Sequence, residues 1–467
     1  MKFHTSTDFI AHNSKHTKKL PLQLKTIILL AFLSSFLGIM FSLIGMHFKF
    51  YYLFYIFVII VFIKIVIKMF DYNQINITVY INLLLQYSMI ITLPITLYYT
   101  NIFVYIIHLK DMLLPFIVSV YCIYKITNIS KLKTFIRYVT YGSIFYSSFL
   151  IVEFFNKIFG FSPSLNRAIA SYVTHSGRSF QLLMSDYESN NPINIIRPIG
   201  LDTNFTATAF ISASGLLILI IMGRHVFSNK SVQTFGIMIS YFAVLISTSR
   251  QIIGSVHIIL FMLLIILLFK NNLSIVLHKT KKVIKVLFAF VIMMIFILVP
   301  KIPIVYYKFI SEPSTGSILI DNFKSLPNNI IKNLVSHPIN SFFGIGGYTP
   351  DAQDVLYGNM AKIGELHFLL DIPYTMGFIG FFLYWYIIYK SGKLSWQASK
   401  FTRNKLYVDI YITGAFLGIL FALNIIHYSP VGIFSCFFVA LIPVIAVIAQ
   451  KQIRYENYTH KLGTLNE

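Results

Sequence analysis

The sequence predicts an all-α polytopic integral membrane protein with about twelve transmembrane helices and two long external loops. Of the 467 residues, 57% are hydrophobic and only 12% are charged, and the mean hydropathy is +0.73, far above that of a soluble globular chain. Apolar runs near the ~20 residues that cross a bilayer recur along the whole chain. Lys and Arg gather in alternate connecting segments, as the positive-inside rule requires. We therefore treat residues 1–467 as a single membrane domain.

Each predicted span follows one of these apolar runs. In chain order the spans are 24–46, 50–67, 77–98, 104–126, 136–157, 203–222, 232–248, 252–269, 283–300, 368–390, 407–426 and 430–450. The first is long enough to remain as an anchor, and no small-residue cleavage site follows it, so we do not interpret it as a cleaved signal. The fourth is interrupted by Lys110 and Asp111.

The charge distribution orients these spans. With the N-terminus inside, the cytoplasmic segments carry 26 of the 38 basic residues but 5 of the 16 acidic residues. The positive-inside rule accounts for nearly all of the net charge of +22, so nucleic acid is excluded as a partner. Both termini are then cytoplasmic, and two long loops, 159–202 and a partly helical 301–367, are external. Loops of this length tend to carry function.

The first candidate segment is RPIGLDTNFTATA, which begins at Arg197. Gly200 permits a tight turn, and Asp202 or Thr203 is expected to cap the following helix. An arginine beside a helix N-terminus suits an anion, because the guanidinium binds phosphate oxygens in pairs. The alternative is an interfacial arginine that touches lipid headgroups.

The second candidate is Arg250 in LISTSRQIIGS, which lies between two spans at the external face. A charge there is costly unless it faces a partner or a water-filled cavity. The alternative is a turn arginine that extends to the lipid headgroups. The third candidate is HPINSFFGIGGYTP, which begins at His337. Gly344 and Gly346 allow a close backbone approach to a ligand, although the segment could equally be an ordinary loop before a surface helix.

The fourth candidate is KIGELHFLLDIP, where an apolar helix begins with Glu365, His367 and Asp371. His367 and Asp371 are four residues apart and share a helical face. A carboxylate and an imidazole at the edge of a low-dielectric region can supply a general base. The alternative is a polar helix entrance hydrated among the headgroups. The acidic stretches DYE and DAQD fall in exposed loops, so we expect no metal site.

Together these segments resemble the superfamily of O-antigen polymerases (Wzy) and O-antigen ligases, which are bacterial membrane glycosyltransferases. The shared pattern is an Arg-x-x-Gly before a span, a Ser-Arg at the end of a later one, and a loop with Gly-x-Gly that leads to a helix with Gly-x-x-Gly. It is carried by Arg197, Gly200, Asn204, Ala207, Ser249, Arg250, Pro338, Gly344, Gly346, Glu365 or His367, Gly377 and Gly380. Ligases typically have His-Asn before the last helix, whereas His367 is followed by Phe368, and this favours a polymerase.

The resemblance implies a polymerase in the bacterial inner membrane that extends glycans on undecaprenyl diphosphate, without cofactor or metal. Arg197 and Arg250 would bind the diphosphate, and His367 or Glu365 would act as the base, with Asp371 orienting the imidazole. Gly200, Asn204, His337, Gly344 and Gly346 would support the site. The implied partners are the lipid-linked oligosaccharide and membrane lipid, with a chain-length regulator and a flippase as further candidates. The alternatives are a ligase-type transferase and a flippase or transporter for the same lipid-linked sugar.

Overall fold

The structure is a computed structural model of the chain. It describes residues 20–44, 51–68, 77–99, 101–102, 105–106, 112–159, 161–162, 164–165, 168–169, 198, 200–202, 205–247, 249–269, 342–344, 368–402, 404–424 and 432–465. These residues are almost entirely helical, and they include no β-strand. The predicted all-α class is therefore confirmed for the part of the chain that the structure describes.

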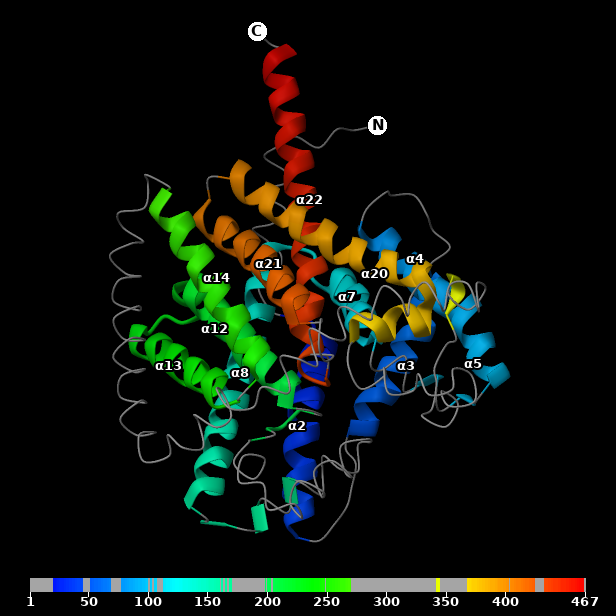
Figure 1. Ribbon diagram of the computed structural model, residues 1–467. Coiled ribbons are helices and arrows are strands. Elements are labelled where there is room, and N and C mark those ends of the chain that lie inside the picture. The colour runs from blue at the N-terminus through cyan, green and yellow to red at the C-terminus, as the bar shows by residue number, and fades with distance from the viewer. Residues whose placement is uncertain are drawn as a thin grey trace, which may run out of the picture.

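The main helices form one bundle (Figure 1). They are α2 (Leu22–Leu43), α3 (Tyr51–Lys68), α4 (Ile77–Tyr87), the π-helix η1 (Ser88–Thr92), α5 (Leu93–Tyr99), α7 (Leu114–Lys125), α8 (Ile129–Phe159), α12 (Phe205–Val226), α13 (Lys230–Ile246), α14 (Arg250–Phe269), α20 (Phe368–Phe401), α21 (Lys405–Asn424) and α22 (Cys436–Leu465).

Six helical segments in the described residues are long and apolar enough to cross a membrane. They are Leu22–Leu43, Ile77–Tyr98, Ile129–Lys157, Thr206–Val226, Lys405–Asn424 and Cys436–Arg454. Each coincides with a predicted span. Shorter apolar helices occupy four more predicted spans, at Leu53–Ile63, Leu114–Lys125, Lys230–Ile246 and Gln251–Leu263. The predicted span 368–390 lies within α20. The predicted span 283–300 and most of both long loops lie outside the described residues. The count of twelve spans and the two external loops therefore stay a prediction.

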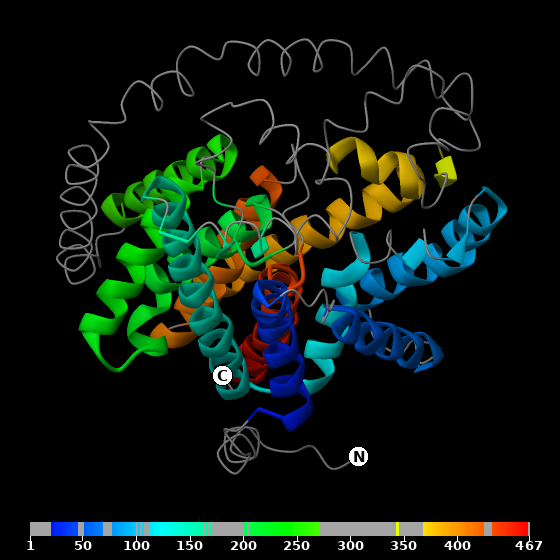
Figure 2. The same cartoon turned by 90° about the horizontal axis from the view of Figure 1, so that it is seen from below.

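Helix α22 lies at the centre of the bundle. In both views α3, α4 and α5 are on one side of it and α12, α13 and α14 are on the other (Figures 1 and 2). Its last turns project beyond the other helices in Figure 1. Every side chain from Cys436 to Val447 except that of Pro443 is among the buried hydrophobic residues, and Phe434 stacks on Tyr146 of α8 with ring centroids 4.8 Å apart. A helix that is apolar all round is a buried helix, and this explains the central place of α22.

Small polar side chains hold α8 against α12. The Ser143 hydroxyl donates to the Ile211 carbonyl at 2.9 Å, and the Ser147 hydroxyl donates to the Ser212 hydroxyl at 2.9 Å. Lipid gives no hydrophobic driving force between helices, so membrane helices associate through close packing of small residues and interhelical hydrogen bonds. These contacts fix the axial position of α12 relative to α8.

Contacts between helix ends divide the bundle into two faces. On one side the Arg224 guanidinium and the His225 Nε2 lie 3.2 and 3.1 Å from one Asp409 carboxylate oxygen, which joins the end of α12 to the start of α21. On the opposite side Asp202 contacts the start of α22 through backbone N–H groups. We call these the Asp409 face and the Asp202 face. The predicted spans alternate in direction across the membrane. This alternation places the end of α12 and the start of α21 on one side of the membrane, and Asp202 and the start of α22 on the other side.

Two helices are irregular. The π-helix Ser88–Thr92 joins α4 to α5 within one continuous helical segment, two residues before Pro94, whose nitrogen has no proton for the helical hydrogen-bond ladder. In α20 the backbone at Gly377 is non-helical, with φ 65° and ψ −179°. The short stretch of α20 before Gly377, which includes Asp371, is therefore offset from the long stretch after it.

Candidate functional site

The structure places only part of the predicted site. Gly200 and Gly344 are described in full, and Arg250 and Asp371 are placed by their backbone, Arg250 as the first residue of α14 and Asp371 in the first turn of α20. The other predicted site residues, Arg197, Asn204, His337, Gly346, Glu365 and His367, lie outside the described residues.

The turn predicted at Gly200 is confirmed. Gly200 has φ 83°, in the left-handed region that favours glycine, and it is buried. A Cβ at this position would overlap the side chain of Thr208, which lies one turn into α12. Only glycine therefore lets the chain reach α12 by this path.

A buried ion pair at the end of α8 holds this turn. The Gly200 N–H donates to Glu153 Oε2 at 2.7 Å, and Lys157 Nζ lies 2.9 Å from Glu153 Oε1. The Glu153 side chain is fully buried, and the Lys157 side chain is 7% exposed. Sequence reasoning missed this pair, although the signal was present: two opposite charges four residues apart in a membrane span usually mark a functional site.

Asp202 ties the same segment to the central helix. Its carboxylate is fully buried and accepts hydrogen bonds from the N–H groups of Ile433 at 2.8 Å and Ser435 at 3.2 Å. The sequence prediction placed Asp202 or Thr203 as a cap of the helix directly after it. These bonds instead join Asp202 to the start of α22, more than two hundred residues away, where a negative charge is stabilised by the helix dipole. The sequence prediction did not include a contact between Asp202 and the start of α22.

The first turn of α14 is attached to the last turn of α21 on the same face. The Gln251 side-chain amide donates to the Leu423 carbonyl at 2.6 Å. The neighbouring Asn424 is fully buried, and its side-chain oxygen is an acceptor with no hydrogen-bond partner among the described residues. Sequence reasoning also missed Asn424. The contact places Arg250, the residue before Gln251, beside the end of α21.

The Asp202 face therefore gathers three helix N-termini, those of α12, α14 and α22. The first N–H groups of a helix have no acceptor within the helix itself, and its N-terminus carries a partial positive charge. Asp202 neutralises the start of α22, and α14 begins with an arginine. Helix N-termini and an arginine are groups that bind anions in proteins.

Gly344 is brought to the break in α20. Gly344 has φ 81° and Gly377 has φ 65°. A Cβ at Gly344 would overlap the Thr375 carbonyl oxygen, and a Cβ at Gly377 would overlap the Phe342 carbonyl oxygen. Two segments that sequence reasoning singled out separately therefore meet backbone to backbone.

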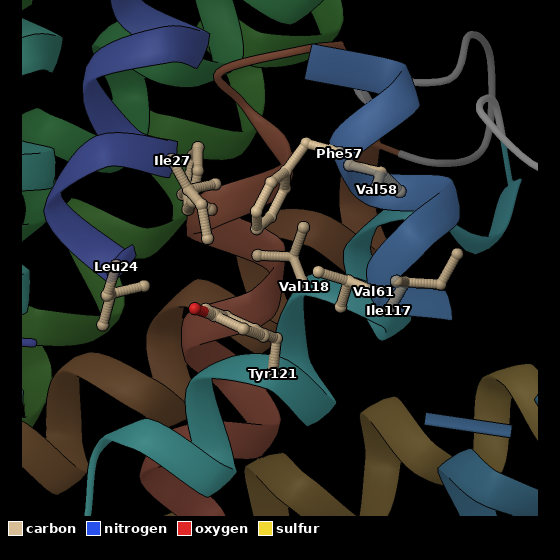
Figure 3. Close-up of a pocket in the computed structure, with 9 residues that line it drawn as sticks. Leu24, Ile27, Phe57, Val58, Val61, Ile117, Val118 and Tyr121 are labelled. Carbon is tan, nitrogen blue, oxygen red and sulfur yellow. The ribbon is translucent and has the colours of Figure 1, made fainter. Parts of the chain in front are cut away.

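An apolar pocket lies elsewhere, among α2, α3, α7 and α22 (Figure 3). Its lining consists of Leu24, Ile27, Phe57, Val58, Val61, Ile117, Val118, Tyr121 and Phe437. The Tyr121 hydroxyl is the one polar group of this lining, and it lies 3.5 Å from Gln23 Oε1. The lining provides no acid, base or cation for chemistry on a sugar or a phosphate.

Within the described ranges, no three His, Cys, Asp or Glu side chains come together as metal ligands would. No protein-family model, no curated protein and no solved structure matches the chain. The function is therefore argued from the residues and their geometry.

Proposed function

We propose that the chain is a membrane glycosyltransferase that polymerises oligosaccharide repeats carried on undecaprenyl diphosphate, transferring the growing glycan to a new repeat. The observation that carries this proposal is the convergence on the Asp202 face of three helix N-termini, with Arg250 as the first residue of α14. Arg197 precedes Pro198 and the buried Gly200 turn by a few residues. Cationic groups at this face would meet the diphosphate of a lipid whose chain lies in the membrane.

The transfer needs one bond to form as another breaks. A hydroxyl oxygen of the acceptor sugar attacks C1 of the donor sugar, and the bond from C1 to the diphosphate oxygen breaks. The leaving diphosphate keeps the electron pair, so negative charge grows on it in the transition state. Arginines held at that point stabilise the transition state more than the ground state, and this lowers the barrier.

A base must take the proton of the attacking hydroxyl. Glu365 or His367 would fill this role, with Asp371 orienting the imidazole. Asp371 belongs to the short stretch of α20 before Gly377, which also meets the Gly344 segment. In this proposal the second predicted external loop delivers the base to the donor sugar.

A flippase or transporter for the same lipid-linked sugar is the second candidate. The break at Gly377 favours it, because transporters build their substrate sites from interrupted helices. The buried charges of the described bundle favour the transferase instead, since Glu153, Lys157 and Asp202 belong to the Asp202 face. A ligase-type transferase differs from a polymerase in its acceptor alone.

Deletion of the gene, followed by gel analysis of the surface glycan, separates these functions. A polymerase deletion strain still displays single repeats, a flippase deletion strain displays none, and a ligase deletion strain keeps long chains on the carrier lipid. Single repeats are the expected result. A strain that displays no repeats, or that keeps long carrier-linked chains, would contradict the proposal.

The two arginines provide the test of the site. Arg197→Ala and Arg250→Ala should each lower chain extension by about 100-fold or more, as loss of one transition-state donor does. Arg224→Ala is the matched control, because Arg224 lies on the Asp409 face. Full-length polymer in both arginine variants would overturn the diphosphate assignment. The dependence of the chain-extension rate on pH, measured for Glu365→Gln and for His367→Ala, then identifies the base. The variant that lacks the base should lose the change of rate with pH that comes from titration of that base.

A further inference from the structure

Tyr87 lies where three irregular segments of the chain meet. It is the last residue of α4 and directly precedes the π-helix Ser88–Thr92. The second segment is the short piece Phe342–Gly344, and the third is the break of α20 at Gly377. In both views the short piece, drawn in yellow, lies beside α4 and the first part of α20 (Figures 1 and 2).

The Tyr87 hydroxyl joins the second segment to the third. It lies 2.9 Å from the Phe343 carbonyl oxygen and 2.8 Å from the Met376 carbonyl oxygen. Within a regular helix, the carbonyl at 376 would pair with the N–H four residues later, and the non-helical Gly377 interrupts this pattern. The hydroxyl therefore lies between a carbonyl of the loop segment and a carbonyl beside the helix break.

Glycines make room for this contact. The mutual approach of Gly344 and Gly377 leaves no space for a side chain at either position. At Gly380, a Cβ would lie 3.3 Å from the Tyr87 ring, in tight contact. Gly377 and Gly380 form the Gly-x-x-Gly of the sequence, so this pair lies beside the tyrosine.

The helix behind Tyr87 is held by buried hydroxyl groups. Ser88 Oγ lies 2.9 Å from Thr92 Oγ1 and 3.1 Å from the Tyr105 hydroxyl, and Thr92 donates to the Ser88 carbonyl at 2.6 Å. All three side chains are buried. The π-helix that follows Tyr87 thus has polar contacts of its own, within the helix and to Tyr105.

We propose that Tyr87 is a positioning residue for the transfer reaction. Its hydroxyl fixes the Phe342–Gly344 segment against the break in α20, so this piece of the second predicted loop and the helix start that includes Asp371 keep one relative placement. The inference rests on the proposed function, because it requires the loop and this helix start to serve the reaction. Its structural part, that Tyr87 holds the segment, is measurable without any assay of activity.

A cysteine reporter measures the structural part. Phe343 is 37% exposed, whereas the native Cys122 and Cys436 are fully buried, so Phe343→Cys provides the reactive thiol. The rate at which a maleimide labels this cysteine in membranes is measured in three proteins: the Phe343→Cys variant, the same variant with Tyr87→Phe added, and the same variant with Tyr124→Phe added. Tyr124 is 59% exposed on α7 and makes a matched control for loss of a hydroxyl. Gly344→Ala, which forces the same two segments apart without touching Tyr87, is the second perturbation.

Tyr87→Phe and Gly344→Ala should each raise the labelling rate by about two- to tenfold, as loss of a hydrogen bond allows, and Tyr124→Phe should leave it unchanged. In a chain-extension assay Tyr87→Phe should lower the rate severalfold at an unchanged amount of protein in the membrane. An unchanged labelling rate would overturn the inference, and so would faster labelling with normal chain extension. If the wild-type protein extends no chains, the proposed function and the reaction part of the inference fail, while the labelling rates still decide whether Tyr87 holds the segment.

Discussion

Replacement of Asp202 by alanine should destabilise the bundle strongly. The Asp202 carboxylate is fully buried and accepts two hydrogen bonds, from the N–H groups of Ile433 and Ser435. Alanine leaves both donors without this acceptor in a space that water does not reach. Each unsatisfied buried group costs about 1–3 kcal/mol, so the free energy of unfolding should fall by about 2–6 kcal/mol.

Two further variants give smaller expected losses of stability for comparison with Asp202→Ala. Asp202→Asn keeps one acceptor oxygen and nearly the same volume, so it should lose about half as much stability as Asp202→Ala. Asp409→Ala removes a carboxylate from the other face. That loss should be smaller than the loss in either Asp202 variant, because Arg224 and His225, the two partners of Asp409, are 37% and 20% exposed and water can reach them after the change.

The assay is unfolding of the purified protein by titration with sodium dodecyl sulfate, followed by tryptophan fluorescence or circular dichroism. The expected order of stability is wild type, then Asp409→Ala, then Asp202→Asn, then Asp202→Ala. If the free energy of unfolding of Asp202→Ala lies within about 1 kcal/mol of the wild-type value, the reasoning is refuted, because two unsatisfied buried donors should destabilise the protein by more than that.

Two other changes test the buried pair and the helix break. Glu153→Gln keeps an acceptor for the Gly200 N–H but removes the negative charge that Lys157 faces, so the free energy of unfolding should fall by about 3–5 kcal/mol. Adding Lys157→Met should restore most of this loss. A double variant no more stable than the single variant in the same titration would contradict this expectation. Gly377→Ala should sharply lower the yield of folded protein on size-exclusion chromatography, because its Cβ would overlap the Phe342 carbonyl oxygen at a positive φ. Gly392→Ala in the same helix, where a Cβ would meet nothing within 4 Å, is the control, and equal yields would show that the close approach at Gly377 is unimportant.

The helices were predictable because their cause is local. Backbone groups in lipid must be satisfied within the segment, so an apolar run of about 20 residues becomes a helix whatever surrounds it. The spans at 24–46 and 407–426, for example, correspond closely to α2 and α21. The left-handed turn at Gly200 was also predictable, since glycine between a loop and a helix indicates a turn.

The breaks and the polar pairs were harder to predict. Pro94 was a signal for the π-turn within the third span, since proline removes a donor from the helical ladder. The break at Gly377 has no such signal, because glycine is tolerated within a helix and the cause here is the approach of Phe342–Gly344 from a distant part of the chain. The roles proposed for Glu365 and His367 stay predictions, since both residues lie outside the described part of the chain.

The sequence by itself determined that this chain is helical, that several of its segments are long and apolar enough to cross a membrane, and which of its segments carry the charges. These properties follow from the transfer of individual side chains and peptide groups between water and lipid, which needs no knowledge of neighbours. Only the tertiary structure decided that Glu153 holds Gly200, that Asp202 meets the start of α22, and that Tyr87 joins Phe343 to the break in α20. A buried polar group is stable only beside a partner, and which partner it meets depends on how helices far apart in the sequence pack together.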